Sequence, residues 1–343
     1  MSAPLSFVEP PHRSRFRRAL LRLLMVAVLL GAVAAAGVVL YQASGHTAQA
    51  GPASSETLGA VVPPVTEPFA SLGGQGHPKA ARQEKAAALP PLDGSHAAAA
   101  RVKGVHVRGG IVIDAKTGRV VWARRPHLEL PIASLTKLMT AVAFAARPKE
   151  LSHTITVRKA WLGIGQSSIY LKPNQHITVS QLVQGLLMVS GNDAANTLAH
   201  VRSETVPAFV RRMNARARML GLRDSAFSNP SGLYDTGNHS SAWDLADLGR
   251  YVLRDPVLSH VVSLRTAPAP RHQTWVNHNK LLWNYAGARG LKTGYTDLAG
   301  SCLAAAATRK GRTLIAIVLH ADGDEFTMAG RLLDYGFAHD RHA

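Results

Sequence analysis

Apolar residues recur every three or four positions in several stretches of the chain, which is the spacing that buries one face of an α-helix. The stretches with this pattern are 134–146, 179–189, 193–220 and 241–254. Thr178 is followed three residues later by Gln181, a capping box that favours a helix start at Val179. These patterns predict a large helical part of the protein.

Short apolar runs predict strands in the other parts, near residues 111–123, 292–307 and 312–319. Within the first of them, two apolar runs flank Lys116-Thr117-Gly118, so this triplet is predicted to be the turn of a hairpin. Together, the helical and strand signals predict an α+β fold.

The N-terminus begins with a basic segment and an uncharged one. The basic residues are Arg13, Arg15, Arg17, Arg18 and Arg22. The uncharged run 23–41 has 19 residues, enough to span a bilayer core of ~30 Å. Because a positive flank stays on the inner side, residues 1–22 are predicted to be a cytoplasmic flank and the remainder to be exported, to a periplasmic or extracytoplasmic space. Segment 23–41 is either an inner-membrane anchor or a signal h-region, since Ala48-Gln49-Ala50 resembles a cleavage site.

Residues 42–103 are rich in Ala, Pro, Gly and Ser and contain few large apolar groups, so they bury too little surface to fold. We predict a flexible tether with an average reach of about 45 Å, taking ~5–6 Å times the square root of its length. Residues 104–338 then form the folded domain, and 339–343 form a short tail.

The formal charge is +18, from 39 Lys and Arg against 21 Asp and Glu. No helix-turn-helix, zinc or aromatic-interleaved motif supports nucleic-acid binding, so we expect no nucleic-acid partner and attraction to an anionic wall or membrane surface instead. The 16 histidines lack the paired spacing of a zinc site, so no metal or other cofactor is predicted. Cys302 is the only cysteine and is predicted to be buried.

Three short motifs carry the candidate chemistry. They are Ser134-Leu135-Thr136-Lys137, Ser190-Gly191-Asn192 and Lys292-Thr293-Gly294, separated by 52 and 99 residues. Ser134 is predicted at a helix N-terminus, where the helix dipole favours an attacking alkoxide and the oxyanion that follows. Lys137 lies one turn further on the same face, and burial or a second cation such as Lys292 would lower its pKa enough to make it a base.

Each triplet also has a structural explanation. Ser134 would serve as a plain helix N-cap, and Gly191 as a left-handed residue that ends a helix. Lys292-Thr293-Gly294 would be a solvated hairpin strand. In the functional interpretation, Lys292 and Thr293 on a strand edge offer a cation and a hydroxyl to a substrate carboxylate, and Gly294 permits close approach of a substrate backbone.

The order and context of these motifs resemble the low-molecular-mass penicillin-binding proteins, which are D-alanyl-D-alanine carboxypeptidases and endopeptidases of serine type. The similarity runs from about Val105 to Phe337. It covers residues 111–118, 131–140, 190–195, 227–233 and 290–296. The resemblance implies a β-lactamase/transpeptidase-like fold, in which an antiparallel sheet is flanked by helices and a mainly helical lobe holds Ser190.

The resemblance also implies roles for the motif residues. Ser134 is expected to be the nucleophile and Lys137 its general base, while Ser190 relays a proton to the departing amine. The backbone N–H groups of Ser134 and Tyr295 are expected to form the oxyanion hole. In substrate binding, Asn192 is expected to hold the substrate amide, Lys292 and Thr293 its terminal carboxylate, and Gly294 the approaching backbone.

The expected activity is therefore that of a D-alanyl-D-alanine carboxypeptidase on peptidoglycan stem peptides, with β-lactams as covalent inhibitors. An endopeptidase of cross-links and a non-catalytic wall-binding protein are the alternatives, together with a class A β-lactamase. The last needs a water-activating carboxylate, but no glutamate occurs between Glu204 and Glu325. Asp224, Asp235, Asp244 and Asp247 lie in that stretch. Asp244 fits a capping position after Ser241, and the others match no water-activating signature.

Overall fold

A computed structural model describes residues 89–95, 97, 100–163, 165–233 and 237–339. The predicted cytoplasmic flank, membrane segment and most of the predicted tether lie outside these residues, as does most of the predicted tail. Within the described part of the chain, no helix has the length and apolar character needed to cross a membrane.

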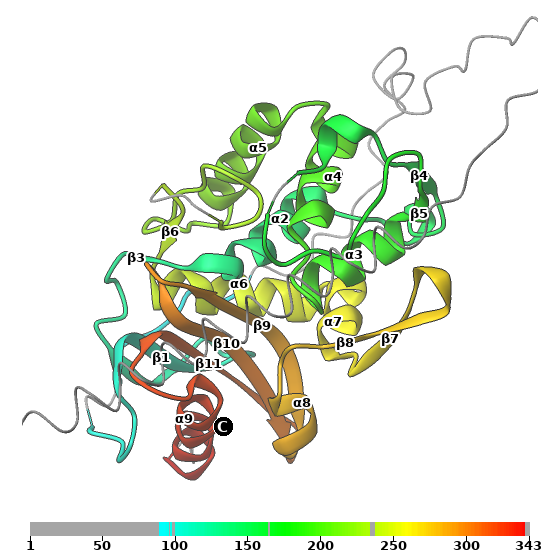
Figure 1. The fold of residues 1–343 in the computed structure, drawn as a ribbon. Helices are drawn as coiled ribbons and strands as arrows, with labels where there is room; N and C mark the ends of the chain where they lie inside the picture. Colours follow the sequence, from blue (N-terminus) through cyan, green and yellow to red (C-terminus); the bar gives the residue numbers. More distant parts are fainter. Residues whose placement is uncertain (1–88, 96, 98–99, 164, 234–236, 340–343) are drawn as a thin grey trace, which may run out of the picture. The chain divides into compact units, whose positions relative to one another are not determined.

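The centre of the described region is a five-stranded antiparallel sheet in the order β2-β1-β11-β10-β9 (Figure 1). Its strands are β1 Val107–Asp114, β2 Val120–Arg124, β9 Ala288–Thr296, β10 Gly300–Arg309 and β11 Arg312–Ala321. The first and last strands of the domain, β1 and β11, are therefore neighbours. The predicted hairpin turn is confirmed, because Asp114 accepts hydrogen bonds from the N–H groups of Lys116 and Thr117 between β1 and β2.

Helices cover both faces of this sheet, as predicted (Figure 1). On one face, Leu314 and Ala316 join the core formed with α9 Glu325–His339. Side chains alternate along a strand, and Ile315 accordingly contacts Gly249 of α6 Ala242–Arg254 on the other face. The predicted α+β fold with an antiparallel sheet is thus confirmed.

The other helices and the short strand pairs complete the domain. The helices are α2 Thr136–Phe144, α3 Val179–Leu187, α4 Asn192–Ser203, α5 Val206–Met219, α7 Pro256–Ser263 and α8 Leu281–Asn284. The pairs are β3 Leu130–Pro131 with β6 His239–Ser240, β4 Thr154–Thr156 with β5 His176–Thr178, and β7 Thr266–Ala269 with β8 Gln273–Val276. Helices α2 to α5 contact one another and form a mainly helical lobe.

Two helix boundaries differ from the prediction. The stretch 193–220 contains two helices, because Glu204 ends α4 with a φ of 61° and Pro207, which lacks an N–H group, lies in the first turn of α5. The stretch 134–146 begins with a 3₁₀ turn, Ala133–Leu135, and becomes α-helical at Thr136. The predicted capping residues of α3 and α6, Thr178 and Ser241, are confirmed.

The packed part of the chain begins before the predicted boundary at residue 104. The carbonyl of Pro90 accepts a hydrogen bond of 2.9 Å from Arg250, and Asp93 exchanges backbone hydrogen bonds with the hairpin turn at Gly118 and Val120. The indole of Trp122 donates to the carbonyl of Ala100. Residues predicted as the end of a tether therefore contact the domain, since backbone hydrogen bonds need no apolar side chains.

Candidate active site

Ser134 lies in the 3₁₀ turn that leads into α2. Ala133 has a φ of 47°, a left-handed conformation that is uncommon for a residue with a Cβ. The residue in the cap position of α2 is Leu135, and no side chain caps the helix there. The hydroxyl of Ser134 therefore does not serve as a helix cap, and it contacts Lys137 instead.

Lys137 is fully buried and makes three hydrogen bonds. Its Nζ lies 2.9 Å from Ser134 Oγ, 2.7 Å from Asn192 Oδ1 and 2.6 Å from the carbonyl oxygen of Ser231. Burial lowers the pKa of Lys137 well below its ordinary value, and the charge of Lys292 lowers it further against the opposing effect of Asp193. The charge of Lys292 thus acts on the pKa of Lys137 in the direction expected of a second cation.

The second motif forms the turn between α3 and α4. Asn192 is the first residue of α4, and its amide donates to the carbonyl of Gly165 while its oxygen accepts from Lys137. Ser190 is buried in the same turn, two residues earlier. The prediction of a left-handed Gly191 is wrong: Ser190 has the positive φ, 64°, and Gly191 has −59°. Gly191 is small because a Cβ there would lie 3.0 Å from Ile169.

The third motif lies on β9, the edge strand of the sheet. Gly294 lies close to the 3₁₀ turn that contains Ser134: a Cβ on Gly294 would lie 3.1 Å from the backbone nitrogen of Ser134. Lys292 is buried and donates to the carbonyl of Thr293, and burial lowers the pKa of Lys292 to about 7. Thr293 is partly exposed. Tyr295 is 65% exposed, and its hydroxyl donates to Asp297.

The structure thus brings Ser134, Lys137 and Asn192 into one hydrogen-bonded group, with β9 alongside. A model of the D-alanyl-D-alanine carboxypeptidase family, peptidase S11, matches residues 96–323. The chain belongs to this family.

Carboxypeptidases of this family from other bacteria are similar over most of the domain. The chain is 31% identical to D-alanyl-D-alanine carboxypeptidase DacF of Bacillus subtilis over 243 residues, which are 67% of this chain and 62% of that protein. It is 35% identical to DacB2 of Mycobacterium tuberculosis over 66% of this chain and 81% of that protein. The crystal structure of the Streptomyces K15 DD-transpeptidase shares 30% identity and a TM-score of 0.65, covering 70% of this chain and 100% of that one.

The segment 229–232 also belongs to the candidate site, although its motif gave no such role from the sequence alone. The carbonyl of Ser231 holds Lys137, and Gly232 beside it has a φ of 78°. A Cβ on Gly232 would lie 1.9 Å from the carbonyl oxygen of Ala133. Asn229 fixes this turn by accepting from the N–H groups of Ser231 and Gly232. The cluster Asn-Pro-Ser-Gly at 229–232 is a turn signal, but a turn signal does not say which carbonyl a distant lysine will bind.

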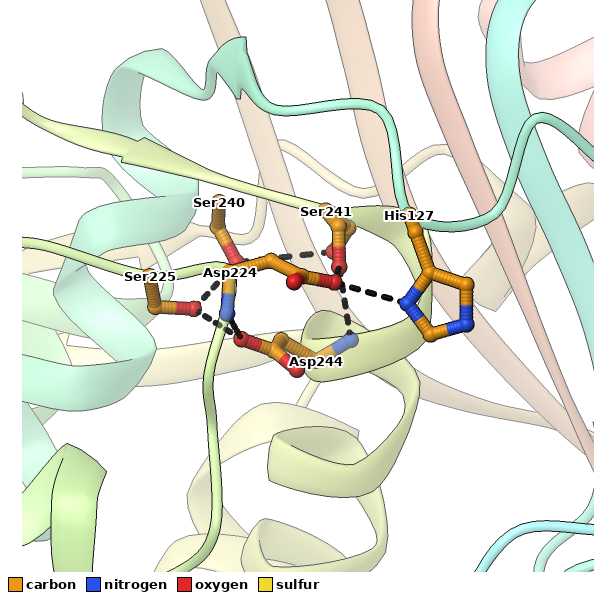
Figure 2. Close-up of polar contacts among 6 residues, drawn as sticks. All are labelled: His127, Asp224, Ser225, Ser240, Ser241 and Asp244. Atoms are coloured by element: carbon orange, nitrogen blue, oxygen red, sulfur yellow. Dashed lines mark hydrogen bonds and ion pairs between the residues drawn. The ribbon is translucent and has the colours of Figure 1, made fainter.

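A polar network lies beside the strand pair β3–β6, whose strand β3 leads into the turn that contains Ser134 (Figure 2). Asp224 accepts hydrogen bonds of 2.8 Å from His127 and from Ser241, and Asp244 accepts from Ser225 and from the N–H group of Asp224. Two of the aspartates considered for a β-lactamase water are thus engaged in this network. A third, Asp247, forms an ion pair with Arg250, and Asp235 lies outside the described residues. The described residues contain no cluster of His, Cys, Asp and Glu suited to a metal ion, and Cys302 is buried.

Proposed function

We propose that this chain is a serine D,D-carboxypeptidase that removes the terminal D-alanine of peptidoglycan stem peptides through an acyl-enzyme on Ser134. The observation that carries the proposal is the 2.9 Å contact between Ser134 Oγ and the fully buried Nζ of Lys137. Membership of the D-alanyl-D-alanine carboxypeptidase family supports this substrate class.

The first step needs Lys137 to be neutral, which its burial favours. A neutral amine has two hydrogens and one lone pair. The hydrogens are held by Asn192 Oδ1 and the Ser231 carbonyl, so the lone pair is left for the hydroxyl of Ser134. As the proton of Ser134 moves to Lys137, Oγ attacks the carbonyl carbon of the penultimate D-alanine.

The developing oxyanion is stabilised by the backbone N–H groups of Ser134 and Tyr295, each worth about 3 kcal/mol of barrier in comparable sites. Gly294 supports this role, because its lack of a side chain allows β9 to approach the nitrogen of Ser134. Ser190 then relays the proton taken up by Lys137 to the departing amine of D-alanine, and the C–N bond breaks to leave the acyl-enzyme. Water completes the hydrolysis and releases Ser134.

Residues of β9 and Asn192 bind the substrate. A charged Lys292 and the hydroxyl of Thr293 bind the terminal carboxylate, while Asn192 holds the substrate amide. The similar Streptomyces structure is a DD-transpeptidase, so transfer of the acyl group to an amine is the alternative fate of the acyl-enzyme. Because the substrate lies in the wall, we place the site outside the cytoplasm, exported by the N-terminal segment, which serves either as an inner-membrane anchor or as a signal peptide.

The test is intact-mass spectrometry of the full chain mixed with benzylpenicillin. We expect one persistent adduct on the wild type, none on Ser134→Ala, and a normal adduct on the control Ser152→Ala, which changes an exposed serine away from the site. Rapid loss of penicillin without an adduct would indicate a β-lactamase, and a folded protein that does not react would indicate a wall-binding role. Incubation with a D-Ala-D-Ala peptide, with and without an acceptor amine, then measures how hydrolysis and transfer divide.

A further inference from the structure

A cavity of about 480 Å³ is lined by residues outside the candidate active site. It lies beside Thr308 near the end of β10 and Thr313 near the start of β11. The hairpin turn at Lys116 and the C-terminal part of α6 also line it. None of its lining residues belongs to the three motifs. Arg289, which lines it, precedes Thr293 on β9 by four residues, or about 13 Å of extended strand.

The lining of this cavity is strongly basic. Four basic residues from three segments of the chain line it: Lys116 of the hairpin turn, Arg250 and Arg254 of α6, and Arg289 of β9. No acidic residue lines the cavity. The nearby carboxylate of Asp247 accepts one hydrogen bond from Arg250 Nη1. Gathering like charges raises the local potential and is unfavourable unless an anion compensates for it.

Arg250 is held rigidly in the wall of the cavity. Its side chain is buried, with Nε donating to the carbonyl of Ala115 and Nη1 to the carbonyl of Pro90, at 3.0 and 2.9 Å. Its Nη2 is also buried but has no hydrogen-bond partner among the described residues. A buried guanidinium with an unsatisfied donor is costly, and an anion bound in the cavity beside it would compensate its charge.

The uncharged residues of the lining indicate what else a ligand would contain. Leu89, Pro90 and Leu253 add apolar surface to the lining. Thr308 and Thr313 add hydroxyl groups, whose oxygens lie 2.8 Å apart. The segment that carries Pro90 is fixed by the backbone hydrogen bonds of Asp93 to Gly118 and Val120. The lining therefore combines cationic and hydroxyl groups with apolar side chains.

We propose that this cavity binds a phosphate group that is esterified to a small glycerol-like or apolar body. A carboxylate brings one charge and two oxygens, whereas a phosphate ester brings up to two charges and several oxygens, which suits several guanidinium forks better. A soluble phosphate ester and the headgroup of an anionic lipid present this same group. The site is distinct from the proposed peptidase site and does not depend on its activity.

The experiment compares two triple variants of the full chain, purified in detergent. The first, the cavity variant, is Lys116→Gln with Arg254→Gln and Arg289→Gln, which removes three of the four charges of the lining. The second, Arg211→Gln with Arg218→Gln and Arg223→Gln, removes the same charge from exposed positions elsewhere. Circular dichroism verifies the fold of both variants. If the cavity variant does not fold, Lys116→Glu on its exposed turn replaces it.

Isothermal titration with sn-glycerol 3-phosphate and with inorganic phosphate tests the soluble source. Flotation with phosphatidylcholine vesicles, with and without phosphatidylglycerol, tests the lipid source. We expect saturable binding of at least one probe, weakened about tenfold or more by the cavity variant, because charged hydrogen bonds are lost, and less than about twofold by the control. The probe whose binding is weakened in this way shows whether the ligand is a soluble phosphate ester or a lipid headgroup. Equal weakening in both variants, or no saturable binding of any probe, would overturn the proposal.

Discussion

Lys292 is a buried lysine whose charge affects two parts of the site. Its cation is proposed to bind the substrate carboxylate, and it also lowers the pKa of Lys137. Burial brings the pKa of Lys292 itself to about 7, so the residue loses its charge as the pH rises through neutrality. The free enzyme therefore needs Lys137 neutral and Lys292 charged at the same pH.

This requirement predicts a descending limb in the pH profile of benzylpenicillin acylation. In the wild type, the second-order rate constant should fall above about pH 7, approaching tenfold per pH unit. Lys292→Arg keeps the charge at every pH of the assay, so its lower rate should show no such fall up to about pH 9. The control, Lys280→Arg at an exposed position, should keep the wild-type profile. An unchanged descending limb in Lys292→Arg would show that another group titrates.

Gly232 is a second residue whose importance follows from its surroundings. Gly232 and Gly311 have nearly the same φ, 78° and 77°, but a Cβ would collide with the Ala133 carbonyl at the first and meet nothing within 4 Å at the second. Alanine substitutions at the two glycines therefore separate two losses of stability. One comes from a left-handed backbone alone, and the other from displacing the 3₁₀ turn that contains Ser134.

We predict that Gly311→Ala lowers the free energy of unfolding by about 1–2 kcal/mol, the cost of a left-handed residue, and leaves acylation unchanged. Gly232→Ala should cost more stability and also slow acylation by at least about tenfold, because the Ser231 carbonyl and Ser134 lose their positions. Urea unfolding and the penicillin acylation rate measure the two effects. Equal losses of unfolding free energy and equal acylation rates in the two variants would mean that the close approach of Gly232 to the Ala133 carbonyl affects neither stability nor acylation.

At the scale of elements, Glu150 joins the 3₁₀ turn Pro148–Glu150 to helix α4. Its carboxylate accepts from Arg147 at 2.8 Å and from Arg202 at 3.1 Å, and its side chain is 6% exposed. Although burial opposes it, these hydrogen bonds lower the pKa of Glu150 to about 2. The ion pair therefore connects a turn after α2 to the helix that begins with Asn192.

A lowered carboxylate pKa contributes stability that is present above the unfolded pKa and is lost as the pH falls. For Glu150, the loss should occur between about pH 4.5 and 2 and amount to at most about 3 kcal/mol, at ~1.4 kcal/mol per unit. Glu150→Gln should thus have a lower free energy of unfolding than the wild type at pH 7. This difference, the stability gap, should narrow toward pH 3 in urea titrations. Glu129→Gln, at a 58% exposed residue, should show almost no gap. A gap for Glu150→Gln that is constant with pH would contradict the assignment.

The break between α4 and α5 shows how local chemistry overrides periodicity. The apolar spacing continues through 193–220, but Thr205 caps a new helix and Pro207 cannot donate to the preceding turn. The break redirects the chain, so that α4 and α5 both pack against α2. The sequence held this signal, since a capping threonine followed by proline marks a helix start.

At the scale of the whole domain, the sheet order brings distant segments of the chain together. β1 and β11 pair although more than 190 residues separate them, and β9 at the edge then lies beside the turn that holds Ser134. The same order places the end of β10 and the start of β11 next to the hairpin turn, where the basic cavity forms. One topology thus builds the candidate peptidase site and the proposed anion site.

The sequence by itself determined the α+β class, the family resemblance, the hairpin turn, most helix starts and the side chains of the three motifs. These follow from periodicity and residue type, which are local properties of the chain. The folded arrangement was needed to show that the Ser231 carbonyl holds Lys137 and that Ser190 is the left-handed residue. It was also needed to show that Pro90, Asp93 and Ala100 contact the domain and that four basic residues from three segments line one cavity. A backbone carbonyl leaves no mark in the sequence, and residues far apart become neighbours only once the chain has folded.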